Sequence, residues 1–201
     1  CSHSAEKIQE LLLVTQENAY LGRPSIFMKL RLFFFLITCT LVFTQSKLAT
    51  AQSELANKLN DGTHILLMRH ADAPGYGDPK NYQIGKCSTQ RNLGDQGRKQ
   101  AKNTGDWLSS QGIGQAKVYS SPWCRCIDTA TLLNKGDVKK EVALGSFFDD
   151  MSQAKKQTDE LTKFIAAERK QFPSTPIIMV THHVNIYEFM GENIASGDLV
   201  L

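Results

Sequence analysis

Two short, almost wholly apolar runs end abruptly in polar side chains: "THILLMRH" at residues 63–70 and "PIIMVT" at residues 176–181. An apolar run of this length that delivers polar residues at its end is typical of a buried central strand. Such a strand needs cover on both faces of its sheet, which helices usually supply. These two runs therefore constrain the chain toward a sheet of buried strands with helices around it.

Helical and strand patterns alternate along the rest of the chain, and this alternation predicts an α/β fold. We expect a three-layer α/β/α sandwich with a mostly parallel central sheet. Ser121-Pro122 is the expected start of one helix, because serine caps helices and proline suits the first helical position. The other elements are expected at about 95–111 (helix), 116–121 (strand), 121–133 (helix), 140–148 (a weaker strand), 152–172 (helix) and 197–201 (strand).

The first quarter of the chain does not resemble part of such a domain. From Met28, a short basic segment is followed by the apolar run 32–43 and by a small-x-small sequence that ends at Ala51. This order is typical of a secretory signal peptide, and the run is shorter than the roughly 20 residues that span a bilayer. We expect a signal peptide over 28–51, with a retained anchor or a buried helix as the alternative, and interpret 1–27 as a non-native or over-extended segment.

The remaining residues, 52–201, are expected to form one periplasmic or secreted domain without a membrane span. The chain is 41% hydrophobic, enough for one core, and its scattered basic residues and net charge of +3 give no case for nucleic acid as a partner. In an exported protein, Cys87, Cys124 and Cys126 suggest one disulfide and one spare thiol. Cys124 and Cys126 are too close to pair comfortably, so we expect Cys87 to pair with one of them. The sequence leaves open whether the native chain continues past Leu201.

Polar residues that follow three of the predicted strands are expected to meet. Arg69 and His70 end the first strand, Arg125 lies in the first turn of a helix, and His182 follows the fourth strand. Carboxyl ends of parallel strands share one edge, where ligands bind. Arginine forks, imidazoles and helix N-termini together describe a pocket for a doubly charged anion. A neutral imidazole there can attack phosphorus, the cations stabilise the transition state, and a carboxylic acid protonates the leaving group.

The segments "LLMRHAD", "VYSSPWCRCIDTA" and "VTHHVNI" resemble, in order and spacing, the three signature segments of the histidine phosphatase superfamily, which has the phosphoglycerate mutase-like fold. The resemblance extends over about residues 62–201. It implies that His70 is the phosphorylated nucleophile and that Arg69, Arg125 and His182 bind the phosphoryl group. It also implies a phosphatase that needs no metal or other cofactor.

The chain departs from the family pattern at two places. Ala71 stands where the family commonly has glycine, a change that some branches share. No glutamate lies where the family's proton donor is usually found; the segment "GSFFDDM" offers Asp149, which we favour, and Asp150, with Asp72 as a third candidate. The insertions that form substrate lids in related mutases and phytases are absent. We therefore expect a small, open phosphatase that acts on a phosphorylated small molecule or glycan.

The motifs "CSTQRN" and "WCRC", taken with the export signal, resemble those of a small exported bacterial branch of the family. There, a disulfide would pin the loop that carries Cys87 to the helix that carries Arg125. Two other functions stay open: a non-catalytic phospho-ligand binding protein of the same fold, and a metal-binding module built from the three cysteines, His182 and His183. Zinc sites usually have CxxC or HxxxH spacing, which the chain lacks, and we expect His183 to be a surface or rim residue. The sequence does not determine the physiological substrate or the oligomeric state.

Overall fold

The computed structural model describes residues 54–201, so the expectations for residues 1–27 and 28–51 lie outside the described residues. The described part contains strands and helices in alternation, as the sequence predicts. The strands are β1 (Leu66–Arg69), β2 (Lys117–Ser120), β3 (Val138–Lys140), β4 (Ile177–Thr181) and β5 (Leu199–Val200), and the helices are α3 (Asp95–Ser110), α4 (Cys124–Leu133), α5 (Ala154–Gln171) and α6 (His183–Met190).

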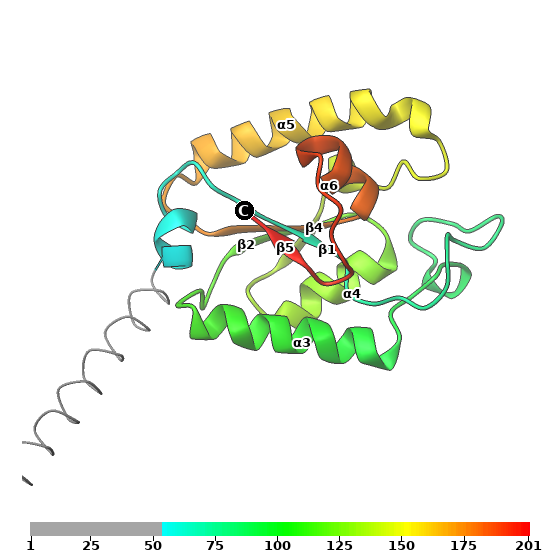
Figure 1. Ribbon diagram of the computed structural model, residues 1–201, viewed down its shortest axis with the longest axis horizontal. Coiled ribbons are helices and arrows are strands. Elements are labelled where there is room, and N and C mark those ends of the chain that lie inside the picture. Colours follow the sequence, from blue (N-terminus) through cyan, green and yellow to red (C-terminus); the bar gives the residue numbers. More distant parts are fainter. Residues whose placement is uncertain (1–53) are drawn as a thin grey trace, which may run out of the picture. The chain divides into compact units, whose positions relative to one another are not determined.

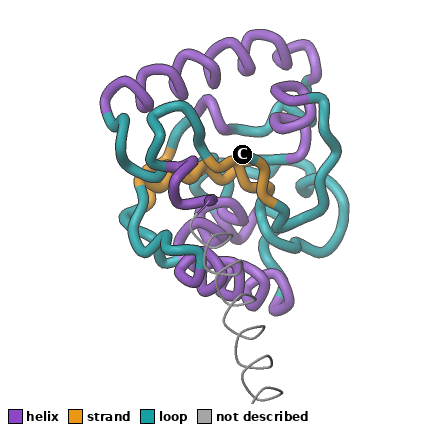
Figure 2. The backbone as a smooth tube through the Cα atoms, turned by 60° about the vertical axis from the view of Figure 1, so that its left-hand side comes forward, coloured by secondary structure: helices purple, strands orange, loops and turns teal. Residues whose placement is uncertain are grey.

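The strands form one five-stranded sheet in the order β3-β2-β4-β1-β5. Neighbouring strands are parallel except for β5, which runs antiparallel to β1. Figure 1 shows α5 and α6 above the sheet and α3 and α4 below it, and Figure 2 shows the same strands between two helical layers. The predicted three-layer α/β/α sandwich with a mostly parallel sheet is confirmed.

The two central strands are buried on both faces, which explains their continuous apolar sequence. In β4, Ile178 and Val180 belong to the core cluster shared with α3 and α4. Ile177 and Met179 belong to the cluster on the other face, shared with α5 and α6. Alternate residues of a strand point to opposite faces, so a strand with helices on both sides needs apolar residues at every position.

The register between β1 and β4 determines which residues leave the sheet together. Arg69 is paired with Thr181, the last residues of the two strands. The pairing extends one step further, because the His70 amide donates to the Thr181 carbonyl at 3.0 Å. The next residues along the two chains, His70 and His182, therefore emerge side by side at the same edge.

Two local predictions are wrong. The third strand is β3, and residues 140–148 form instead a 3₁₀ turn, η2 (Val142–Leu144), and a loop. Lys140 is the last residue paired with β2, and the Glu141 side chain then accepts from the Ala143 amide and starts the turn. Helix α4 begins at Cys124 rather than at Ser121-Pro122, and its first residue is capped from another part of the chain.

That cap comes from Gln90, whose side-chain oxygen accepts from the Cys124 amide at 2.9 Å. The Trp123 position before the helix offers no side-chain cap of its own.

Among residues 54–201, no helix has the length and apolarity to cross a bilayer.

Helices α3 and α4 approach so closely that a glycine is required between them. A Cβ atom at Gly105 would lie 2.3 Å from the Leu133 carbonyl oxygen, a backbone atom that cannot move without moving α4. We therefore predict that Gly105→Ala lowers the free energy of unfolding by roughly 1–3 kcal/mol, the usual cost of overpacking, despite alanine's better helix propensity. Urea unfolding measures this change.

Gly114→Ala is the matched control, since a Cβ atom there meets nothing within 4 Å. It should leave the urea midpoint within experimental error of the wild type. Equal midpoints for the Gly105→Ala variant and the wild type would contradict the close approach of the two helices.

Candidate active site

A cavity of about 420 Å³ opens at the carboxyl end of the parallel strands. Arg69, His70, Arg125 and His182, the residues expected to meet there, all line it. The loop between β1 and α3, residues 71–92, forms much of the remaining wall and lies at the right of Figure 1. The structure thus brings together the whole predicted phosphate-binding constellation.

His70 is held as a neutral imidazole with a defined tautomer. Its Nδ1 lies 2.8 Å from the Ala71 carbonyl oxygen, which can only accept, so Nδ1 carries the hydrogen. Its Nε2 therefore carries a lone pair, which accepts from Arg125 Nε at 3.2 Å. Burial lowers the pKa of His70 to about 3, with a further contribution from the nearby guanidinium groups. At neutral pH Nε2 is therefore unprotonated and faces a cation.

His182 lies beside His70 and is oriented from two sides. The two ring centroids are 5.5 Å apart. Arg125 Nη2 lies 3.4 Å from His182 Nδ1, and Ser121 Oγ lies 2.8 Å from Nε2. Burial lowers the pKa of His182 well below its usual value. Ser121, predicted to cap a helix, instead uses its hydroxyl to hold this imidazole.

The arginines present nitrogen atoms to the cavity from three segments. Arg125, from the first turn of α4, is 4% exposed. Arg69 donates through Nη1 to the Ile194 carbonyl at 2.7 Å, while its buried Nε has no hydrogen-bond partner among the described residues. Arg91 also lines the cavity, and its Nε donates to the Gly77 carbonyl at 2.8 Å. Their combined positive charge suits an anion with several oxygens.

Arg91 and Asp78 are site residues that the sequence analysis missed. Both lie in the loop 71–92, and Asp78 forms a buried salt bridge with Arg125 at 3.0 Å. The available signal was their place in a long loop after a strand that ends in Arg-His, since loops at this edge of a parallel sheet line ligand sites. Nothing in the local pattern distinguishes these two from other charged residues of the same loop.

The three candidate proton donors lie in different surroundings. Asp149 lines the cavity and accepts from the Tyr82 hydroxyl at 3.0 Å. Asp72 also lines the cavity. Asp150 does not line it and accepts from the Ser152 amide at 3.1 Å, at the start of the 3₁₀ turn η3 (Met151–Gln153). Hydrogen bonds from Ser152 lower the pKa of Asp150. The geometry therefore leaves Asp149 and Asp72 as donors within reach of the site.

The disulfide joins Cys87 to Cys124, with a Cα–Cα distance of 5.6 Å, and leaves Cys126 free and buried. The expected pairing of Cys87 with one of the other two cysteines is confirmed. Two of the ligands of the alternative metal-binding module are consumed in this bond. Within residues 54–201, no three His, Cys, Asp or Glu side chains are arranged to hold a metal ion. His183 lies at the cavity wall beside Phe148, with ring centroids 5.9 Å apart, as expected of a rim residue.

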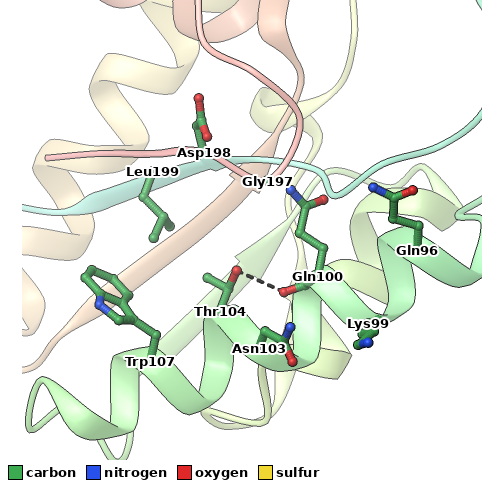
Figure 3. A pocket seen from close by; sticks show the side chains of 9 residues that line it. All are labelled: Gln96, Lys99, Gln100, Asn103, Thr104, Trp107, Gly197, Asp198 and Leu199. Atoms are coloured by element: carbon green, nitrogen blue, oxygen red, sulfur yellow. Dashed lines mark hydrogen bonds between the residues drawn. The ribbon is translucent and has the colours of Figure 1, made fainter.

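A second hollow of about 730 Å³ lies outside this constellation, between α3 and the segment that leads into β5. Figure 3 shows its wall, with Trp107 at one end and Gln100 directed toward Gly197. It is lined by neither histidine nor arginine. Gln100 links it to the active-site cavity, because its oxygen accepts from the Asp72 amide and its nitrogen donates to the Ser196 carbonyl. The hollow thus adjoins the candidate active site but is lined by none of its histidines or arginines.

The sequence profile of the histidine phosphatase superfamily (branch 1) matches residues 65–152, which include His70 and Arg125. Over these residues the chain is similar to that superfamily. The comparison with curated proteins gave no match.

Solved structures share the fold of the described domain. A mycobacterial glucosyl-3-phosphoglycerate phosphatase in complex with VO3 has a TM-score of 0.51 and 14% identity, over 67% of this chain and 90% of that chain. The product of an open reading frame of Mycobacterium tuberculosis has a TM-score of 0.50 and 17% identity, over 67% of this chain and 88% of that one. At these identities the likeness concerns the fold alone.

The disulfide should stabilise the domain and hold its loop 71–92. It closes a sequence separation of 37 residues, for which loop-closure entropy gives roughly 4 kcal/mol. We predict that reductant lowers the melting temperature and accelerates trypsin cleavage at the exposed Lys80 and Lys86. Limited proteolysis with mass spectrometry measures the second effect. A Cys87→Ser/Cys124→Ser variant should be cleaved at the same fast rate with or without reductant, and an unchanged melting temperature after reduction would refute the role.

Stability should also depend on the titration of His70. Its pKa is about 3 in the folded domain and near 6.5 when unfolded, so acid favours the unfolded chain. The folded domain therefore has its full stability, as far as His70 is concerned, above about pH 6.5, and the free energy of unfolding decreases as the pH falls toward 3. We predict a loss on the order of 2 kcal/mol from His70 between pH 7.5 and 5, measured by urea unfolding. His70→Asn should lose less over the same interval, whereas His64→Asn, at a partly exposed site, should not reduce the loss.

Proposed function

We propose that this protein is a phosphomonoester hydrolase that works through a phosphohistidine formed at His70, without a metal ion. The observation that carries the proposal is the unprotonated Nε2 of His70, which lies 3.2 Å from Arg125 Nε inside the cavity. A nitrogen lone pair with a guanidinium directly beside it can attack phosphorus while the cation binds a phosphoryl oxygen. The family of the domain supports the same reaction class.

In the proposed reaction, the guanidinium groups of Arg69, Arg91 and Arg125 and the imidazole of His182 bind the phosphoryl oxygens. His70 Nε2 attacks phosphorus and the ester P–O bond breaks. Asp149, at the cavity wall, donates a proton to the departing oxygen. Water then gives a proton back to the Asp149 carboxylate and attacks phosphorus, and the N–P bond breaks, which releases inorganic phosphate and restores the imidazole. The low pKa of His70 keeps its Nε2 unprotonated for the first step, and the cations stabilise the charge on the transferring group in both steps.

A phosphorylated small molecule or glycan is the proposed substrate. The cavity of about 420 Å³ has room for a leaving group beside the phosphoryl group. One structural neighbour is a glucosyl-3-phosphoglycerate phosphatase, which supports this class of substrate. We also propose that the protein acts in the periplasm or outside the cell, as the signal-peptide pattern leads us to expect. The Cys87–Cys124 disulfide supports an oxidising compartment.

A second candidate function is the binding of a phosphorylated ligand without turnover. It is favoured by the surroundings of Asp149, whose carboxylate is exposed and already accepts from the Tyr82 hydroxyl. The two functions differ in whether a covalent phosphoenzyme forms, because a binding protein needs the cations but not the nucleophile.

Replacement of the nucleophile tests the proposal. We predict that His70→Ala lowers kcat for p-nitrophenyl phosphate, assayed with EDTA present, by at least about a thousandfold, as expected when a catalytic nucleophile is removed. Circular dichroism checks the fold. Rapid acid-free quenching of the wild type with a ³²P-labelled substrate should trap label that is stable to alkali and labile to acid, as a phosphohistidine is.

His64→Ala is the control histidine variant, because His64 lies away from the cavity and pairs with Asp61. It should keep wild-type turnover. Wild-type turnover in the His70→Ala variant would refute the mechanism. Phosphate binding by a wild-type protein that shows no turnover would favour the binding function instead.

A further inference from the structure

Asp78 is a buried carboxylate that the proposed reaction does not use. Gly75 and Gly77 have φ values of +93° and +65°, so the loop turns twice before it, and Pro79 favours extended backbone at Asp78. Its side chain is only 5% exposed. Both oxygens lie 3.0 Å from Arg125 Nη1, and the carboxylate also accepts from the Trp123 indole N–H at 3.1 Å and the Arg91 amide at 2.9 Å.

These contacts determine which edge of the Arg125 guanidinium faces the cavity. Nη1 is occupied by Asp78 on the loop side. Nε then points at His70 Nε2, at 3.2 Å, and Nη2 at His182 Nδ1, at 3.4 Å. The Nε–Nη2 edge is a planar pair of donors that matches two phosphate oxygens. The Asp78 carboxylate thus binds Nη1, and the edge formed by Nε and Nη2 faces the two histidines.

We propose that Asp78 is the positioning residue for Arg125, and that its carboxylate keeps the guanidinium edge in register with a phosphoryl group on His70. The inference rests on the proposed function for its chemistry. An arginine side chain has several rotatable bonds, and a buried two-oxygen contact removes the rotation that would turn Nε away. The carboxylate also offsets one of the three guanidinium charges crowded around the neutral imidazoles.

A double-mutant cycle tests whether Asp78 acts through Arg125. The variants are Asp78→Asn, Arg125→Gln and the pair, and the measurements are kcat and KM for p-nitrophenyl phosphate and the dissociation constant of inorganic phosphate. We expect Asp78→Asn alone to lower kcat/KM at least about tenfold and to weaken phosphate binding. In the Arg125→Gln background, the same substitution should change either quantity less than about twofold, because residues in one contact are not additive.

Asp128→Asn is the matched control. Asp128 lies on α4, the helix that carries Arg125, but it does not line the cavity and pairs instead with Arg98 at a distance of 3.4 Å. It should change neither quantity. Asp78→Glu keeps the charge but moves the carboxylate, and it should show the same dependence on Arg125; it replaces Asp78→Asn in the cycle if that variant does not unfold cooperatively.

The outcomes separate the inference from the proposed function. Equal losses from Asp78→Asn in both backgrounds, in an active enzyme, would overturn the inference alone. A wild type without turnover whose phosphate affinity follows the non-additive cycle would overturn the hydrolase and support the positioning role. A wild type that neither turns over nor binds phosphate would overturn both.

Discussion

The parallel pairing of β1 with β4 is the interaction on which the candidate active site depends. Because Arg69 is opposite Thr181, the residues that follow, His70 and His182, leave the sheet together. A shift of the register by one residue would exchange the faces of every side chain in one strand and separate the two imidazoles. The two buried apolar faces of β4 hold that register. The register that packs the core therefore also sets the positions of His70 and His182 in the candidate active site.

The loop 71–92 supplies the part of the cavity wall that the edge of the sheet does not form. It is attached to the first turn of α4 in three ways: the Cys87–Cys124 disulfide, the Gln90 cap on the Cys124 amide, and the Asp78 contact with Arg125. These attachments act on two consecutive positions, Cys124 and Arg125. The loop thus serves as wall, helix cap and anchor at once. A covalent bond beside a buried salt bridge restricts the loop and keeps water from the carboxylate.

The electrostatics of the site depend on burial. Two imidazoles lie among three guanidinium groups, and burial and these charges both lower the pKa of His70 and His182. Each protonated imidazole would be a desolvated cation beside other cations, so both remain neutral. This arrangement keeps an unprotonated imidazole where an anion is strongly attracted, and it lowers the stability of the domain in acid. The same burial and the same charges therefore account for the neutral imidazoles and for the loss of stability in acid.

Much of the fold and the centre of the site could be predicted from sequence, because short-range patterns carry that information. The apolar runs indicate central strands, and the polar residues directly after them, Arg69, His70 and His182, must lie at the strand ends. The third strand was misplaced because the two exposed lysines of β3 lack the apolar pattern, and its extent is set by pairing with β2. Asp78 and Arg91 were missed because no periodicity distinguishes one charged loop residue from another.

The sequence by itself determined the α/β architecture and the candidate site residues next to strand ends, since each depends on residues adjacent along the chain. Only the tertiary structure decided which cysteine pairs with Cys87, how α4 is capped and which carboxylate meets Arg125. Those contacts join residues 34 to 47 positions apart. Their partners are chosen by how a turn-rich loop folds over the sheet edge, and that path is set by packing rather than by local propensity.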